Sequence, residues 1–501
     1  MNKINFLLMA LLAIGTSYAQ NINDAVRYST QNISGTARYQ GVSGAFGALG
    51  GDLSAINNNP ASSAIFTNSY ASITAALDMY DNSTQYFNGS MPTDDSDINF
   101  NQGGGVFVLD NNDESSAFRK LAIAFNYDRT ANFDNVYTAS GIGNTSIDAY
   151  FLQFAQGTPL DLLQYRSGEN VDDLYDYLGE NEGFGAQQAF LGYQGYIVDP
   201  AEDDPDNTSY SSAIGSGNFD QEYTSLASGY AGKASFNIAT QYKEKLYVGL
   251  NLNSHFIDYR QSTILFEDNA NANSQVTNLR FENNLSTLGN GFSFQIGGIY
   301  HLSPSLRVGL TYDSPTWYNI EEETTQRLTT SGVNGNVTLD PRVTNVYDDY
   351  TLQTPGKGTA GLAYIFGSNG FLSFDYSYED FSSVTFKPKN DTFFQGLNDE
   401  IDSNLKAVST YKVGGEIKVR KWSFRGGYKY QESPYENDDI MSNLSGFSAG
   451  LGYSFGSARL DLAYSRYTQE SNPQLYDTGL TSTAFVDGVN STVAATFSFR
   501  L

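Results

Sequence analysis

Few side chains in this sequence are suited to catalysis or to binding a transition metal. The chain contains no cysteine, which excludes disulfides, thiolate metal sites, a cysteine nucleophile and a lipidated N-terminal cysteine. Its two histidines, His255 and His301, are expected at opposite ends of a strand-rich structure. Such a pair supports neither a Ser–His hydrolase nor a paired haem site. We therefore expect no enzyme activity, no cofactor and no bound metal.

Two other patterns suggest ion binding, but only superficially. The segment 199–206 (DPAEDDPD) and the cluster Asp94, Asp95 and Asp97 offer carboxylate oxygens that suit Ca²⁺, yet neither has the spacing of an EF-hand. The glycine-rich run at 41–62 is similar to a phosphate-binding loop, but it lacks a GK[ST] ending. Solvated loops and tight turns explain these segments better.

The overall composition is acidic and unusual for a large soluble protein. The 501 residues include 55 acidic and 28 basic ones, for a net charge of −27, which excludes a general nucleic-acid binder because such proteins need a basic face. Only 40% of residues are hydrophobic, whereas Tyr (36) and Phe (33) are abundant. A large soluble core would be undersupplied with apolar side chains.

Residues 1–19 have the features of a secretory signal peptide. Lys3 supplies the positive charge, residues 4–15 (INFLLMALLAIG) form the apolar region, and Ser17-Tyr18-Ala19 is a small-x-small cleavage site. The apolar run is too short to span a bilayer, and no later stretch approaches 18 apolar residues. We expect export, cleavage after Ala19, and any membrane crossing to be made by strands.

Alternating runs of about ten residues predict such membrane-crossing strands. Leu250 and Phe374 belong to apolar faces, whereas their neighbours Asn251 and Asp375 belong to faces of small or charged residues. The runs predict fourteen strands, near 69–79, 101–110, 119–129, 233–242, 245–258, 291–302, 305–314, 358–366, 371–380, 409–419, 421–431, 446–455, 458–468 and 490–501.

The lengths of the connections favour a membrane barrel over a soluble sandwich. Short turns alternate with long connections, which are expected at 80–100, 130–232, 259–290, 315–357, 381–408, 432–445 and 469–489. Outer-membrane barrels have short turns on one side and long loops on the other. The last strand ends on an apolar face at Leu501, which is similar to the C-terminal signal of such barrels. We expect an all-β fold, a 14-stranded antiparallel transmembrane β-barrel.

The segment 20–68 shows no strand rhythm and is expected to fold into the lumen as a plug, beginning with a short helix after Asn23. Its glycine-rich block ends in Asn59-Pro60-Ala61, just before the first strand. This block resembles the plug of the outer-membrane transporters of long-chain fatty acids and aromatic hydrocarbons, the FadL/TodX family. Similar stretches follow at 307–318 (RVGLTYDSPTWY), 354–366 (TPGKGTAGLAYIF) and 424–435 (FRGGYKYQESPY), so the resemblance covers essentially the whole mature chain.

The resemblance implies passive uptake of hydrophobic small molecules. Outer loops would capture the ligand, an interior site gated by the plug would receive it, and a kinked strand would let it leave sideways into the bilayer. Asn59, Pro60 and Ala61 match the plug motif of the family position by position. Some relatives in secretion systems dock exported proteins, so a docking or shuttle component is the alternative function.

Two further groups of residues are candidates for handling ligand. Gly103, Gly104 and Gly105 could form a kink in the second strand and hence a lateral gate, although close packing against the plug is an equal alternative. The insertion 130–232 predicts short helices at 146–156, 159–165, 171–178 and 184–193, the second capped by Thr158. Their apolar residues either line a ligand groove or only pack the loop over the barrel mouth; the groove candidates are Phe151, Phe154, Leu160, Leu163, Tyr175, Leu178, Phe184 and Phe190.

These patterns together predict a signal peptide at 1–19, a plug at 20–68, and a barrel at 69–501 that includes the insertion. We expect a monomer in the outer membrane whose partners are lipid, a hydrophobic small-molecule ligand and, under the alternative function, a secreted protein. No nucleic-acid partner is expected.

Overall fold

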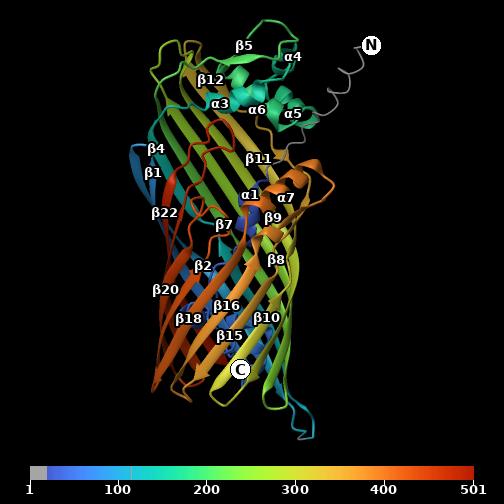
Figure 1. Cartoon of the computed structure of the whole chain (residues 1–501), viewed down its shortest axis with the longest axis vertical. Helices are drawn as coiled ribbons and strands as arrows, with labels where there is room; N and C mark the ends of the chain where they lie inside the picture. The colour runs from blue at the N-terminus through green and yellow to red at the C-terminus, as the bar shows by residue number, and fades with distance from the viewer. Residues whose placement is uncertain (1–19, 114) are drawn as a thin grey trace.

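The computed structural model describes residues 20–113 and 115–501, so the predicted signal peptide lies outside the described residues. The chain forms one closed, antiparallel barrel of 14 wall strands, as the alternating runs predict (Figure 1). The barrel closes where the first strand, β1, pairs along its length with the last, β22. The wall strands are β1 (Tyr70–Tyr86), β2 (Gly89–Asp110), β3 (Phe118–Asn132), β7 (Phe219–Tyr242), β8 (Leu246–Asp268), β9 (Val276–His301), β10 (Leu306–Asp313), β15 (Lys357–Ile365), β16 (Gly370–Asp380), β18 (Ala407–Val419), β19 (Trp422–Gln431), β20 (Leu444–Ser454), β21 (Ala458–Ser471) and β22 (Phe485–Arg500).

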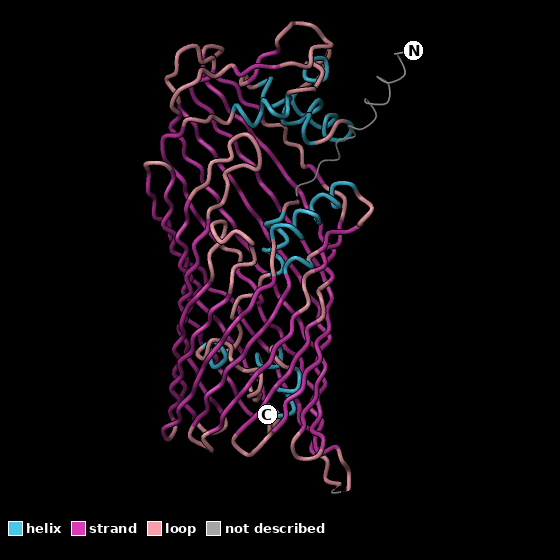
Figure 2. The backbone as a smooth tube through the Cα atoms, in the orientation of Figure 1, coloured by secondary structure: helices cyan, strands magenta, loops and turns pink. Residues whose placement is uncertain are grey.

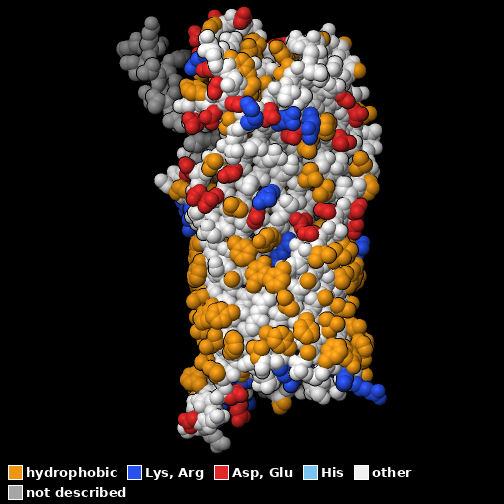
Figure 3. Space-filling model, turned by 180° about the vertical axis from the view of Figure 1, so that it is seen from behind, with side chains coloured by type: hydrophobic (Ala, Val, Ile, Leu, Met, Phe, Trp, Pro, Cys, Tyr) orange, Lys and Arg blue, Asp and Glu red, His pale blue; other side chains and the backbone are white. Residues whose placement is uncertain are grey.

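The two faces of each wall strand differ as the alternation predicts. On β8, Leu250 points outward and is 39% exposed, whereas Asn251 points into the lumen and is fully buried. Outward-facing apolar side chains form a belt around the lower half of the wall, and acidic and basic side chains gather above it (Figure 3). Such a belt matches the hydrocarbon layer of a bilayer. Among residues 20–113 and 115–501, no helix is both long enough and apolar enough to cross a membrane.

Several connections that the sequence predicts as long loops are strands instead. β1 and β2 meet in a tight turn after Tyr86, and β8 and β9 continue far above the apolar belt. The reason lies in the solvent: above the belt the outward side chains face water, as Glu321 and Glu323 do, so alternation of hydrophobicity no longer marks the strand. The short turns at the other end, such as Gly456-Ser457, are where the sequence places them.

Shorter strands complete this upper wall. β4 (Asn135–Gly143) pairs with β7, and β11 (Trp317–Gly332) continues the line of β10 by pairing with β9. The remaining strands are β5 (Val198–Pro200), β6 (Tyr210–Ser212), β12 (Gly335–Leu339), β13 (Asn345–Val346), β14 (Tyr350–Gln353) and β17 (Thr385–Lys387). The predicted insertion 130–232 therefore contains β4 and the first part of β7 as well as helices.

Helices occupy three levels of the molecule (Figure 2). The short helices α2 (Ala37–Gln40), η1 (Ser54–Asn57) and η2 (Pro60–Ile65) lie inside the lower barrel. At mid-height α1 (Ile22–Ser29) contacts α7 (Thr392–Asn404), which is preceded by η3 (Phe381–Ser383). At the outer end lie α3 (Asp148–Ala155), α4 (Leu160–Leu163), α5 (Val171–Asn181) and α6 (Phe184–Gln194), close to the predicted positions.

Candidate functional site

The Asn59-Pro60-Ala61 motif holds the plug against β8 and β9. The Asn59 side chain is fully buried; its Oδ1 accepts from the Ala61 N–H at 3.1 Å and so starts η2. Its Nδ2 donates to the Gly47 carbonyl of the plug at 2.8 Å and to the Gly298 carbonyl of the wall at 3.1 Å. One side chain therefore ties two plug segments to the barrel.

Glycines in the wall make this close approach possible. A Cβ at Gly297 would lie 2.2 Å from Asn59 Oδ1, and one at Gly249 would lie 2.4 Å from the Pro60 carbonyl carbon. These separations are far below van der Waals contact, so both positions require the absence of a side chain. The wall is thus shaped to receive the plug motif.

Inward-facing carboxylates of the wall hold the rest of the plug. Asp375 Oδ2 accepts from the Gly47 N–H at 2.8 Å and from Asn58 Nδ2 at 2.9 Å. Asp128 accepts from Ser54 Oγ at 2.9 Å and from the Asn57 side chain. Hydrogen bonds to charged acceptors are stronger than neutral ones, and these replace water that the carboxylates lose inside the barrel.

Nearer the short-turn end, an ionic cluster joins α2 to the wall. Arg38 Nε lies 3.3 Å from Glu416 Oε2, and the same oxygen accepts from Arg425 Nε at 2.6 Å. Glu416 and Arg425 are buried, and Arg425 Nη2 lies 2.8 Å from Asp461 Oδ1. The plug is therefore fixed by polar and ionic contacts as well as by apolar ones, such as those of Leu53 and Ile56 with Val106 and Ile299 of the wall.

The N-terminal helix α1 packs inside the barrel at mid-height (Figure 1). Asn21 caps it in a capping box with Asp24, two residues earlier than the sequence predicts. Ala25 and Val26 pack in a buried cluster with Phe394 and Ile401 of α7. The 394, 397, 401 spacing of apolar residues after the capping Asp391 is the signal that could have revealed α7 in the predicted loop.

Beside α1, the buried Glu322 carboxylate accepts a hydrogen bond from Gln20, the first residue that the structure describes. Its two oxygens accept from Gln20 Nε2, from Tyr350 OH at 3.0 Å and from Thr287 Oγ1 at 3.3 Å. This level is above the apolar belt, because the neighbouring Glu321 and Glu323 side chains point outward and are exposed. Burial, with the nearby Asp24 charge, raises the pKa of Glu322 to about 7.

The plug separates two cavities. One of about 440 Å³ lies at the short-turn end and is bounded by Arg38, Asp52 and Leu53 of the plug. Another of about 300 Å³ lies higher in the lumen, between β1, β2 and β3 on one side and β20, β21 and β22 on the other. The two cavities share no lining residue. Residues of the plug lie between them.

A seam opens in the wall beside the upper cavity. β2 pairs with β3 only from Gln102 to Asp110, while its residues 89–101 pair with β1 alone. Asn101 on one side of the seam and Asn132 and Asn135 on the other line the upper cavity. β3 carries a register shift at this level, between Arg129 and Ala131. The cavity therefore reaches a place where the wall has no continuous ladder of hydrogen bonds.

The predicted gate glycines lie just below this seam. Gly103, Gly104 and Gly105 remain paired on both sides, with β1 and with β3, and the irregularity in the β1–β2 ladder falls next to them at Thr74/Ala75. A Cβ at Gly103 would lie 2.8 Å from the Phe100 ring, and one at Gly104 only 2.4 Å from Asn126 Oδ1. The glycines thus permit tight packing at the lower end of the seam, and their role in a gate stays a prediction.

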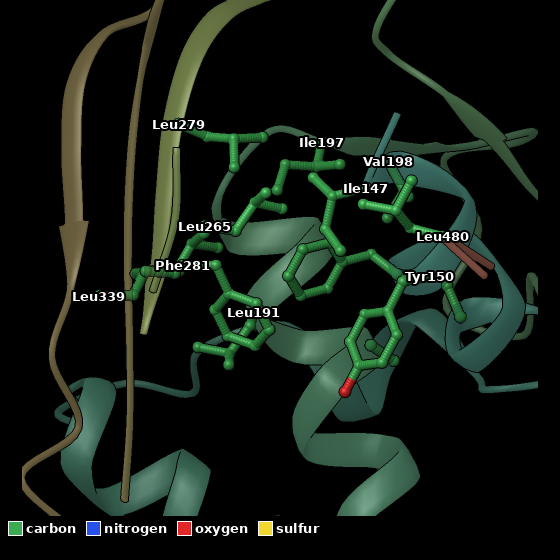
Figure 4. Close-up of a cluster of buried hydrophobic side chains, with 14 of the residues drawn as sticks. Ile147, Tyr150, Leu191, Ile197, Val198, Leu265, Leu279, Phe281, Leu339 and Leu480 are labelled. Carbon is green, nitrogen blue, oxygen red and sulfur yellow. The ribbon is translucent and has the colours of Figure 1, made fainter. Parts of the chain in front are cut away.

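The predicted groove residues pack together at the outer mouth. Phe151, Leu160, Leu163, Leu178 and Phe190 are fully buried. Together with Tyr175 they join wall residues such as Leu265 and Phe281 in one apolar cluster, part of which Figure 4 shows. Phe154 is half-buried against this cluster, and Phe184 is half-buried with its ring centroid 5.9 Å from that of Phe154. In this arrangement the side chains form a packed core over the barrel mouth, and a ligand groove between them stays a prediction.

Two details of this region differ from expectation. Thr158 does not cap α4: Pro159 occupies the N-cap, and Thr158 Oγ1 donates to the Phe154 carbonyl at 3.1 Å. The insertion is instead anchored by Glu267 of β8, which accepts from the Ile147 N–H at 3.1 Å and from Gln221 Nε2 at 2.7 Å. In the part of the chain that the structure describes, no three His, Cys, Asp or Glu residues gather as a metal site.

Sequence patterns gave no role to the lysines inside the barrel. Lys233, Lys357, Lys412 and Lys429 line one small chamber with Asp128 and Glu379. These lysines occupy inward positions of their strands. The alternation predicts small or charged residues there, but it does not indicate which inward residues contact one another. Only the closure of the barrel brings these four strands around one space.

Comparisons with known proteins agree with this architecture. Residues 208–500, more than half of the chain, match the family model described as outer membrane protein transport protein (OMPP1/FadL/TodX). The fold is similar to that of a Pseudomonas aeruginosa FadL homologue, at 12% identity and a TM-score of 0.53 over 94% of this chain and 99% of that one. It is also similar to that of the P. putida toluene transporter TodX, at 13% identity and a TM-score of 0.53 over 93% of this chain and 99% of that one. No curated protein matches the chain.

The family match and the fold lead to the same assignment. The matched segment covers most of the wall, from β6 to β22, and the structural likeness extends over the plug as well. The chain belongs to the FadL/TodX family of outer-membrane transport proteins.

Proposed function

We propose that this protein is a channel for the passive uptake of hydrophobic small molecules, such as long-chain fatty acids or aromatic hydrocarbons, and that its plug is the gate. The observation that carries the proposal is the pair of cavities that residues 20–68 separate. Movement of the plug would exchange its polar seats on Asp128, Asp375 and Glu416 for other polar partners and would also expose apolar plug residues, such as Leu53 and Ile56, that pack against the wall. No step in this process requires a chemical reaction.

The seam offers a second way out of the upper cavity. At its foot, the outward aromatic side chains of Phe100, Tyr127 and Phe256 stack in a row, with centroids 5.4 and 5.9 Å apart. Aromatic rows of this kind mark the interface of a membrane with water. An apolar molecule that leaves between β2 and β3 would therefore enter lipid directly, and Gly103, Gly104 and Gly105 would form the lower edge of that exit.

A disulfide between plug and wall tests the gate. Ser43 Oγ in the plug lies 2.9 Å from Ser448 Oγ in β20, so S43C/S448C places two sulfurs within bonding reach in a chain without native cysteine. Uptake of radiolabelled oleate or toluene would be measured in cells that carry this variant as their only copy. We expect uptake to fall at least about tenfold on oxidation and to recover with a reductant.

The control is a disulfide within the wall. Thr359 Oγ1 and Ser377 Oγ, on neighbouring strands, are also 2.9 Å apart, so T359C/S377C forms a bond that leaves the plug free. Oxidation should not change its uptake. Equal uptake by oxidised and reduced S43C/S448C would reject the moving plug, and uptake no higher than that of cells without the protein would reject transport of these ligands.

One observation favours the alternative function, a docking or shuttle component for exported proteins. The helices α3–α6 form a platform with a packed core above the outer mouth, a shape that could receive a protein. A variant that lacks the platform distinguishes the two functions. Loss of secretion of a specific exported protein with unchanged uptake of oleate and toluene would favour the shuttle.

A further inference from the structure

A hollow lies on the outer face of the wall, within the apolar belt and near the short-turn end. It has a volume of about 760 Å³ and extends over β2, β3, β7 and β8. It shares no lining residue with the two cavities of the lumen or with the small chamber of lysines. Its apolar lining consists of side chains that are exposed outside the barrel, namely Leu109, Phe118, Leu121, Ile238, Val248 and Leu250. The hollow therefore belongs to the surface that meets lipid.

One small side chain on the outward face of β7 explains the hollow. Thr240 alternates with the larger, exposed Ile238 and Tyr242, and its cross-strand neighbours are Leu121 of β3 and Val248 of β8. Its Oγ1 donates to a backbone carbonyl of β3 at 2.7 Å, so the hydroxyl is satisfied within the sheet. The ladders from β2 to β8 are continuous beneath it. The hollow is thus a closed depression in the wall, ringed by larger apolar side chains.

Aromatic and basic side chains border the hollow at its short-turn end. The ring centroids of Phe118 and Tyr242 are 5.4 Å apart, and Lys243 Nζ lies 5.5 Å from the centroid of Tyr242. The Lys243 N–H donates to the Ala117 carbonyl at 2.6 Å, which joins this turn to the chain just before Phe118. Lys245 is exposed in the same turn. Two ammonium groups are therefore available just below the aromatic border.

Acidic side chains lie near these lysines as well. Glu244 stands between them in the sequence, and Asp110 lines the hollow. The local surplus of positive charge is therefore small. A phosphate that accepts hydrogen bonds from the lysines suits this border better than a head group selected by its net charge alone.

The level of these groups in the membrane identifies the occupant. The hollow is continuous with the belt that faces hydrocarbon, so a lipid chain is what reaches it. A chain that lies in a depression has contacts at its sides that a flat wall does not offer. Aromatic side chains mark the level where hydrocarbon gives way to head groups, and lysines at that level bind lipid phosphate.

We propose that this hollow binds one acyl chain of a single glycerophospholipid, from the leaflet at the short-turn end, and that Lys243 and Lys245 bind its phosphate. The phospholipid is thereby held in one place on the wall while its neighbours exchange with the bilayer. This inference concerns the outer face of the barrel and does not depend on the proposed transport.

Native mass spectrometry of the delipidated full-length barrel in an uncharged detergent tests the proposal, because each bound lipid adds its own mass. The probes are palmitoyl-oleoyl phosphatidylethanolamine and the diacylglycerol with the same two chains, which lacks the phosphate. We expect one phospholipid to bind at least about tenfold more tightly than any further copy and than the diacylglycerol. Tenfold is the effect of about one charge-assisted hydrogen bond.

Substitution of the two lysines tests the phosphate site. Lys243→Asn with Lys245→Gln should weaken the first binding event about twentyfold, since each lysine at a lipid surface contributes roughly fivefold. Asparagine suits position 243, where φ is +51°. Lys421→Gln, in another exposed turn at the same end, should bind the phospholipid as the unaltered protein does.

Filling the hollow tests the chain site. Thr240→Phe should weaken the first binding event at least about tenfold, and Thr240→Leu should do so to a smaller extent if the larger ring prevents folding. Ala495→Phe adds the same ring to an exposed position of β22, elsewhere on the belt, and should leave binding unchanged.

The opposite results would overturn the proposal. Several phospholipids that bind with equal affinity would mean that the wall has only ordinary lipid contacts. Equal binding of phospholipid and diacylglycerol would remove the role of the lysines. A first binding event that survives Thr240→Phe, or that Ala495→Phe weakens as much, would show that the chain does not lie in this hollow.

Discussion

At the level of single residues, one added Cβ atom in the wall is expected to change the stability of the bound plug. Gly297 and Gly298 are neighbours on β9, but a Cβ at Gly297 would lie 2.2 Å from Asn59 Oδ1, whereas one at Gly298 would meet only the Tyr247 carbonyl at 3.5 Å. We expect Gly297→Ala to push Asn59 off its seat and to cost the plug about 1–3 kcal/mol, through overpacking and the lost hydrogen bonds.

Limited proteolysis of the plug in the purified protein measures this effect. Gly297→Ala should expose the segment around residue 59 to cleavage faster than in the unaltered chain. Gly298→Ala, which adds the same methyl group in a roomier place, should leave the cleavage rate unchanged. Equal rates for both variants would show that the close approach of Asn59 to the wall is not what holds the plug.

The buried Glu322 carboxyl makes the N-terminal segment sensitive to pH. Its pKa is raised from 4.5 to about 7, so the folded site prefers the protonated form. The stability that it contributes is complete below about pH 4.5 and is lost as the pH rises through about 7, a difference of about 3 kcal/mol. A spin label at Q31C should therefore become more mobile between pH 5.5 and pH 8.

The matched variant is Glu322→Gln, which keeps an acceptor for Tyr350 and Thr287 but does not titrate. Its spin label should have the same mobility at both values of pH. A mobility change that persists in this variant would assign the pH response to another group.

At the level of elements, each wall strand meets lipid only along its lower part. On β8 the outward residues run from Val248 to Phe256 as apolar or small side chains, and Asp258 and Arg260 follow above. Leu250→Arg should cost about 2–4 kcal/mol, because it places a charge near the middle of the apolar belt. Ser262→Arg, on the same face of the same strand but in water, should be close to neutral.

Unfolding in urea in the presence of lipid vesicles measures both variants. A similar loss of stability for Leu250→Arg and Ser262→Arg would move the upper edge of the lipid layer above residue 262. Asn251 offers no milder comparison, because its side chain is fully buried and donates to the Ile56 carbonyl of the plug at 2.9 Å.

The sequence predicts the elements best where one face meets lipid. Each of the fourteen predicted strands has its counterpart in the wall, because a bilayer forces strict alternation. β11 and the outer halves of β8 and β9 were not predicted as strands. Polar groups surround both faces of these segments, so hydrophobicity does not alternate along them. The helices of the insertion could be predicted from local spacing. The burial of Leu160 and Leu163 could not, because it depends on packing of the helices over wall residues.

The site could be predicted only in part, for a related reason. Asn59 is recognisable because its motif is local in the sequence. Lys233 and Lys429 are almost 200 residues apart, and nothing in either strand indicates that they share a chamber. That arrangement depends on the order of the strands and on closure of the barrel. It also depends on the hydrogen bonds that the plug donates to Asp128 and Asp375.

At the scale of the whole molecule, we expect the plug to determine whether the barrel conducts. The wall alone encloses a lumen too wide for its own side chains to fill, and residues 20–68 fill its lower half. Deletion of residues 30–66 should therefore produce steady ion conductance in planar lipid bilayers, at least about tenfold above that of the full chain. Equal conductance would mean that wall side chains close the lumen without the plug. The T359C/S377C variant is a suitable control for folding and insertion.

The upper part of β2 has a consequence for how copies of this protein coexist in a crowded membrane. Its residues 89–101 have a strand ladder only with β1, although Thr93 Oγ1 donates to the Val136 carbonyl of β4 at 2.7 Å, and an edge with one ladder is where another chain can add a strand. Asp94, Asp95 and Asp97 lie along this edge, all exposed. An approaching copy would bring the same three charges against them. We therefore expect the acidic run that first suggests calcium to oppose edge-to-edge association of two copies.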